Sequence, residues 1–166
     1  IHTSCPQTAV EALIPDFRGE GTAISKIVRA SPKVISHNIE TVPRLSPKVR
    51  DSRATYKQSL EVLQKIKDFD SKVYTKSSLM LGIGEYESEV IQTMKDLRSI
   101  DVSILTMGQY LQPSSRHLPV IQYVTPDKFD WFARIARQMG FSYVASGPLV
   151  RSSYKAGEYF LRNAVS

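Results

Sequence analysis

Residues 73–107 read VYTKSSLMLGIGEYESEVIQTMKDLRSIDVSILTM, and their hydrophobic pattern decides the fold. Residues 73–81 form a strand-like run that ends at Gly82. A helical repeat follows over residues 88–100, where Val90, Met94 and Leu97 are spaced i, i+4 and i+7. A second strand-like run occupies residues 102–107. A strand, a helix and a strand in succession predict a βαβ unit with parallel strands.

The same alternation extends in both directions from this unit. Thr125 and Pro126 have the pattern of an N-cap followed by proline at the first helical position, and Gly140 ends that helix. No linker, low-complexity tract or clear repeat interrupts the pattern, so we expect one α/β domain over residues 1–166. Further strands are expected at 9–14, 34–37 and 141–145, and further helices at 22–30, 54–67, 126–139 and 155–165.

The composition excludes several classes of protein. Of the 166 residues, 42% are hydrophobic and 23% are charged, as in globular domains and unlike disordered or collagen-like chains. No apolar run approaches the ~20 residues that a membrane span needs. Residues 1–6 lack the pattern of a secretion signal or a transit peptide. The net charge of +6 comes from basic residues scattered singly, so no nucleic-acid partner is expected.

Polar and glycine residues follow each of the first four predicted strands. Parallel α/β sheets and barrels place their binding sites at the carboxyl ends of the strands. One polar loop after a buried strand would be ordinary, but four in succession favour a ligand-binding face. The residues are Asp16 and Arg18, then Asn38 and Glu40, then Gly82, Gly84 and Glu85, and finally Gln109, Tyr110 and Gln112.

The turn from Gly82 to Glu85 allows two interpretations. Its glycines could let backbone N–H groups approach a phosphate, but it lacks the Lys-Ser/Thr pair of a P-loop and the third glycine of a dinucleotide fingerprint. Alternatively, the glycines form a tight strand-to-helix turn, and Glu85 favours the start of the helix.

His37 and Glu40 resemble an acid–base pair or a partial metal site. The other histidines, His2 and His117, lie in unrelated contexts, so a histidine metal site is not expected. A lone histidine at a strand end is more often structural, and Asn38 and Glu40 are better candidates for hydrogen bonding to a polar ligand. The single cysteine, Cys5, excludes a disulfide and any iron–sulfur cluster built from this chain alone.

Six segments together resemble the lipoyl synthase family of radical S-adenosylmethionine enzymes. The resemblance runs in order from about Val10 to the C-terminus. The segments are EALIPDFRG (11–19), HNIETVP (37–43), TKSSLMLGIGE (75–85), LTMGQYLQP (105–113), YVTP (123–126) and ASGPLVRSSY (145–154).

The resemblance implies a partial TIM-like (β/α) barrel, of which this chain is roughly the C-terminal half, with a C-terminal extension at about residues 141–166. The family uses S-adenosylmethionine and two [4Fe–4S] clusters. A 5′-deoxyadenosyl radical removes hydrogen from C6 and C8 of a protein-bound octanoyl-lysine, and the auxiliary cluster supplies two sulfur atoms. The implied partners are an octanoylated lipoyl-carrier domain and an electron donor.

The resemblance also implies roles for individual residues. Ser153, or less favourably Ser152, would be an unusual serine ligand to the auxiliary cluster, because a hard alkoxide is easily released from iron. Arg18 and Lys76 would contact a ligand carboxylate or the substrate. No catalytic side chain is assigned within this chain. The S-adenosylmethionine pocket would be lined by Asn38, Glu40, Ser78, Gly82 and Glu85, with Gln109 and Tyr110 beneath the adenosyl group.

The chain departs from the family pattern at its cysteines. Lipoyl synthases carry two cysteine triplets upstream of the matched region, and this chain has neither. We therefore expect a truncated or excised piece that stably holds no cofactor, has no turnover, and is poorly soluble or associates with itself because the strand at 9–14 is left as an unpaired edge. Its location would be intracellular: cytoplasmic, mitochondrial or plastid.

Two alternatives to lipoyl synthase activity remain open at this point. One is a non-catalytic half-barrel that binds a partner protein. The other is a different α/β-barrel enzyme that binds a phosphorylated small molecule through residues 82–85. The basic charge toward the C-terminus would suit an acidic lipoyl-carrier domain.

Overall fold

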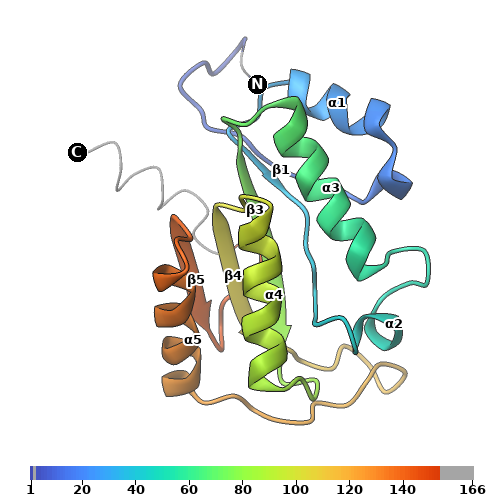
Figure 1. Cartoon of the computed structure of the whole chain (residues 1–166), viewed down its shortest axis with the longest axis vertical. Helices are drawn as coiled ribbons and strands as arrows, with labels where there is room; N and C mark the ends of the chain where they lie inside the picture. Colours follow the sequence, from blue (N-terminus) through green and yellow to red (C-terminus); the bar gives the residue numbers. More distant parts are fainter. Residues whose placement is uncertain (2, 154–166) are drawn as a thin grey trace.

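A computed structural model describes residues 1 and 3–153 of the chain. Within these residues, five parallel strands form one sheet in the order β1-β2-β3-β4-β5 (Figure 1). Over the same residues the sheet is open, with β1 and β5 at its two ends. This confirms the expected α/β class and fits a partial β/α barrel. The strands are β1 (Glu11–Leu13), β2 (Val34–Ser36), β3 (Tyr74–Leu81), β4 (Ile104–Gln109) and β5 (Tyr143–Gly147).

Helices connect the strands, and each of the longer ones lies within about two residues of its predicted position. The Thr55 hydroxyl caps α3 by accepting a hydrogen bond from the Gln58 N–H, and Thr125 caps α5 in the same way. The expected helix at 155–165 lies outside the described residues. The helices are α1 (Gly21–Arg29), α2 (Ser46–Val49), α3 (Tyr56–Phe69), α4 (Glu87–Ser99) and α5 (Pro126–Gln138), with a short 3-10 helix, η1 (Phe17–Gly19).

The hydrophobic core lies between the sheet and its helices. Leu79 and Leu81 of β3 join Leu105 and Met107 of β4 in this core, and none of the four is more than 1% exposed. Figure 1 shows α4 lying across β3 and β4. Because side chains alternate along a strand, the even-numbered residues of β3, including Lys76 and Ser78, lie on the opposite face of the sheet.

The structure differs from the sequence prediction mainly at the carboxyl ends of the strands. Strand β4 continues two residues beyond its predicted end, so Gln109 is its last residue and not part of a loop. Helix α2 was not predicted, because four residues are too few to show a helical repeat. Among the described residues, no helix combines the length and the hydropathy needed to cross a membrane.

Candidate functional site

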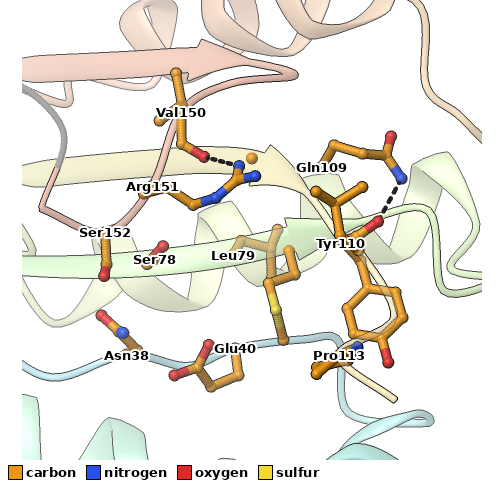
Figure 2. Close-up of a pocket in the computed structure, with 13 residues that line it drawn as sticks. Asn38, Glu40, Ser78, Leu79, Gln109, Tyr110, Pro113, Val150, Arg151 and Ser152 are labelled. Atoms are coloured by element: carbon orange, nitrogen blue, oxygen red, sulfur yellow. Dashed lines mark hydrogen bonds between the residues drawn. The ribbon is translucent and has the colours of Figure 1, made fainter. Parts of the chain in front are cut away.

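A cavity of about 380 Å³ opens at the carboxyl ends of β3 and β4 (Figure 2). Its volume falls within the range of small-molecule sites. Six of the residues that the sequence predicted for a site line it together: Asn38, Glu40, Ser78, Gln109, Tyr110 and the less favoured serine ligand, Ser152. The other lining residues are Leu79, Met80, Gly108, Leu111, Pro113, Val150 and Arg151.

A second, more open cavity of about 490 Å³ lies on the other side of Asn38 and Glu40. These two residues line both cavities, so the two spaces adjoin along the segment that follows β2. The second cavity adds Asp16, His37 and Arg50, together with the apolar residues Leu13, Ile14, Pro15 and Ala54. An extended polar ligand could therefore contact Asn38 and Glu40 from either side.

Glu40 is held in place by its backbone. Its φ of 67° lies in the left-handed region, which is uncommon for a residue other than glycine and is found more often at functional sites. Its N–H donates to the Ser78 carbonyl at 3.0 Å, and its carbonyl accepts from the Met80 N–H at 2.9 Å. Burial raises the pKa of the Glu40 carboxyl, while the Asn38 amide and the Arg50 charge act in the opposite direction.

Arg50 is a candidate site residue that the sequence analysis missed. It is half-buried in the second cavity, and burial lowers the pKa of its guanidinium, while the charges of Glu40 and Asp16 act to raise it. One of its N–H groups donates to the Ser59 hydroxyl at 2.6 Å. A guanidinium has five donors in a planar fork suited to carboxylates and phosphates. No sequence pattern marks Arg50, because it follows the unpredicted α2.

His37 has a structural environment. Its Nδ1 lies 3.0 Å from the Ile14 carbonyl, and its Nε2 lies 2.9 Å from the Ser59 hydroxyl. The Ile14 carbonyl can only accept, so Nδ1 donates; the Ser59 hydroxyl then donates to Nε2 of a neutral ring. Burial lowers the pKa of His37, which favours this neutral form. Both ring nitrogens are thus occupied, as expected of a structural histidine.

Gln109 and Tyr110 hold the loop that follows β4. The Gln109 Nε2 donates to the carbonyls of Tyr110 and Gln122 at 2.9 and 3.0 Å, and its Oε1 accepts from the Val124 N–H at 2.9 Å. The Tyr110 hydroxyl donates to the Leu118 carbonyl at 2.9 Å. Both residues line the first cavity, but their polar atoms are used to fix the wall of that cavity.

Gly82 and Glu85 lie outside both cavities described above. The Glu85 carboxylate accepts hydrogen bonds from the N–H groups of Gly82 and Ile83, at 2.5 and 2.9 Å. A phosphate would have to displace Glu85 to use these donors, so this turn does not form a phosphate cradle. Gly82 has a φ of 101°, and a Cβ there would lie 2.3 Å from the Gln122 carbonyl oxygen, so the position requires glycine.

Lys76 does not line either cavity. Its side chain is buried on the face of the sheet opposite the helices, where Nζ lies 2.7 Å from Oε1 of Glu11. The same carboxylate oxygen accepts a hydrogen bond from the Ser36 hydroxyl at 2.8 Å. Lys76 thereby joins β1, β2 and β3, and its ammonium group already has a partner.

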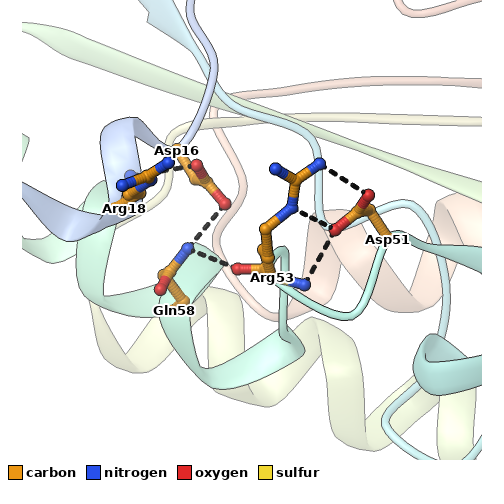
Figure 3. A network of polar contacts seen from close by, with 5 residues as sticks. All are labelled: Asp16, Arg18, Asp51, Arg53 and Gln58. Carbon is orange, nitrogen blue, oxygen red and sulfur yellow. Dashed lines mark hydrogen bonds and ion pairs between the residues drawn. The ribbon is translucent and has the colours of Figure 1, made fainter.

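Arg18 is exposed and also lies outside the two cavities. Its backbone N–H donates to Asp16, whose other carboxylate oxygen accepts from the Gln58 side chain at 2.6 Å (Figure 3). Gln58 also donates to the Arg53 carbonyl, and Arg53 is paired with Asp51. This network fixes Asp16 at the edge of the second cavity.

The two candidate serine ligands are in different surroundings. Ser152 lines the first cavity, whereas Ser153 is exposed and is not among the lining residues. A [4Fe–4S] cluster also requires cysteine thiolates, and Cys5 is the single cysteine of the sequence. Within residues 1 and 3–153, no group of three His, Cys, Asp or Glu side chains is placed to bind a metal. The residues of this chain therefore do not fit a complete cluster.

The fold and the site define an α/β protein with an open parallel sheet and a polar-ligand site at the carboxyl ends of its strands. Sequence comparison shows which proteins the chain is similar to. No family model matches, but the mitochondrial lipoyl synthases of Scheffersomyces stipitis and Homo sapiens are 52% and 53% identical over 165 and 161 residues. The apicoplast lipoyl synthase of Plasmodium yoelii yoelii is 50% identical over 165 residues. Over nearly its whole length the chain is similar to part of the lipoyl synthases.

The match covers nearly all of this chain and a minor part of each relative. It includes 99%, 97% and 99% of this chain, but 42%, 43% and 33% of the respective relatives. The chain thus spans less than half the length of the curated relatives it matches, and a C-terminal segment fits these figures.

Proposed function

We propose that this chain forms the S-adenosylmethionine-binding part of a lipoyl synthase, the enzyme that inserts two sulfur atoms into a carrier-bound octanoyl group. The observation that supports this most directly is the cavity in which Asn38, Glu40 and Ser78 meet at the carboxyl ends of the strands. These residues belong to two of the segments that resemble the family. In the complete enzyme, S-adenosylmethionine and the clusters would supply the radical and sulfur chemistry.

In this proposal Asn38 and Glu40 bind the ribose hydroxyls of S-adenosylmethionine. A carboxylate accepts hydrogen bonds from a diol, and the adjacent amide can both donate and accept. Arg50 lies on the far side of Glu40 and is suited to a ligand carboxylate, such as that of the methionine moiety. An elongated zwitterionic ligand would thus occupy both adjoining cavities.

Ser152 is the better candidate for the serine ligand to iron, because it lines the cavity and Ser153 is exposed. The cysteine ligands would come from sequence that this chain does not contain. An octanoylated carrier domain would be the substrate and a separate protein the electron donor. The names of the relatives support a location in a mitochondrion or a plastid.

The missing cysteine triplets led us to expect that the chain alone stably holds no cofactor, but the preformed cavity predicts that it binds S-adenosylmethionine without a cluster. Isothermal titration calorimetry of S-adenosylmethionine with the full chain tests the proposal. A hydrogen bond to a charged group contributes ~1.5–3 kcal/mol, so Glu40→Gln is expected to weaken binding by roughly ten- to a hundredfold. Glu61→Gln on the exposed surface of α3 is the matched control and should leave the affinity unchanged. Equal binding by the two variants, or no binding by the unchanged chain, would contradict the proposal.

A further inference from the structure

Strands β4 and β5 carry two paired glycines near their carboxyl ends: Gly108 is the second-last residue of β4, and Gly147 is the last residue of β5. Gly108 and Gly147 are cross-strand partners in the parallel register. After Gly147 the chain turns sharply, and the Val150 N–H donates to the Gly147 carbonyl at 3.1 Å. Leu149 at the tip of this turn is 81% exposed, whereas Val150 is buried. The turn therefore folds residue 150 back onto the sheet.

The carbonyl of Val150 occupies the place where a side chain at Gly108 would be. A Cβ built on Gly108 lies 2.1 Å from the Val150 oxygen, well inside the 3.0 Å limit of real Cβ contacts. The φ of Gly108 is not positive, so the position needs glycine for space and not for conformation. A Cβ on Gly147 would lie 3.6 Å from the Val150 side chain, which is an ordinary contact.

The same carbonyl also accepts a hydrogen bond from the side chain of Arg151, whose Nη1 lies 2.8 Å from the Val150 oxygen (Figure 2). This Nη1 also donates to the Pro148 oxygen at 3.3 Å. The next residue, Ser152, lines the cavity together with Asn38 and Ser78. The position of Ser152 therefore depends on how closely Val150 approaches β4.

We propose that Gly108 is a positioning residue: its missing side chain lets the Val150 carbonyl lie against β4 and thereby sets Ser152 at the cavity. Any side chain at position 108 must lift the segment until the contact lengthens from 2.1 Å to at least 3.0 Å. That Ser152 is thereby placed to bind iron rests on the proposed function. The placement of residues 148–152 against β4 does not depend on that function.

Hydrogen–deuterium exchange of the full chain tests the placement without any ligand. In Gly108→Ala, exchange of the Val150 amide and tryptic cleavage after Arg151 are expected to accelerate at least tenfold. In Gly147→Ala, the matched control, both rates should stay within twofold of the unchanged chain. Equal rates in the two variants, or no acceleration in Gly108→Ala, would overturn the proposal.

A spectroscopic measurement separates positioning from general destabilisation. A nitroxide attached to Ser152→Cys, in a Cys5→Ser background, should give a broad, immobilised spectrum with Gly108 and a narrower one after Gly108→Ala. If Gly108→Ala does not fold, the contact between Gly108 and Val150 can still be tested in the unchanged chain. A nuclear Overhauser contact between Gly108 Hα and the Val150 or Arg151 protons is expected, and its absence refutes the contact.

These results are independent of the proposed function. Failure of that function appears as absent S-adenosylmethionine binding by the unchanged chain, whereas failure of the positioning role appears in the exchange and spectroscopic data.

Discussion

Lys76 provides the sharpest test of the structural interpretation, because the sequence resemblance assigned it to a ligand and the structure pairs it with Glu11. Lys76 is 1% exposed, and its Nζ lies 2.7 Å from the Glu11 carboxylate. That carboxylate also accepts from Ser36. Replacing Lys76 by methionine keeps most of the side-chain volume and removes the charge, leaving Glu11 with one neutral partner.

The expected cost of Lys76→Met follows from burial. Removing one partner of a buried ion pair costs ~3–5 kcal/mol, because the other charge remains without compensation. The Glu11 side chain is 22% exposed and therefore only partly buried, although its Oε2 is enclosed without a hydrogen-bond partner, so the lower end, about 3 kcal/mol, applies. Removing both charges in Lys76→Met/Glu11→Leu should cost about 1 kcal/mol, because no unpaired charge is then left.

Urea unfolding of the full chain, followed by far-ultraviolet circular dichroism, measures these free energies. Lys57→Met is the control: Lys57 is 87% exposed, and its pair with Glu61 spans 3.7 Å, so its loss should cost less than about 0.5 kcal/mol. A cost below about 1 kcal/mol for Lys76→Met, or a double variant less stable than the single one, would refute the structural role of Lys76.

Three further predictions follow from the site. Gln109→Glu places carboxylate oxygens against two carbonyls and should lower the free energy of unfolding by about 2–3 kcal/mol in the same urea assay. An unchanged midpoint of urea unfolding would contradict the role of Gln109 in holding the loop. The pKa of His37 is lowered from 6.5 in the folded state, so its contribution to stability is present above that value and lost as the pH falls. Below pH 6.5, His37 should make the free energy of unfolding fall by at most ~1.4 kcal/mol per pH unit. His37→Asn should abolish this dependence, and the control His117→Asn, at an exposed site, should retain it. Because burial raises the pKa of Glu40, S-adenosylmethionine binding should weaken as the pH falls toward that pKa. Calorimetry of Glu40→Gln should show no such pH dependence. An identical pH profile of affinity in both proteins would argue against Glu40 as the hydrogen-bond acceptor.

Much of the fold follows from the sequence because its signals are local. Hydrophobic periodicity and caps such as Thr125 depend on residues a few positions apart, and they predicted the strands and the longer helices within about two residues. Asn38, Glu40, Gln109 and Tyr110 were predicted to lie just beyond strand ends, and they line one cavity because parallel strands end at the same edge of the sheet. Ser78 was named through the family resemblance alone.

The sequence by itself thus determined the α/β class and, through its ordered motifs, the resemblance to the lipoyl synthases. Only the tertiary structure decided what each polar group contacts: Lys76 pairs with a carboxylate 65 residues away, and Gln109 holds a loop 13 residues further along the chain. It also added Arg50 to the site and separated Ser152 from Ser153. The physical reason is that burial and hydrogen bonding are settled by neighbours in space, which residue type and local spacing do not specify.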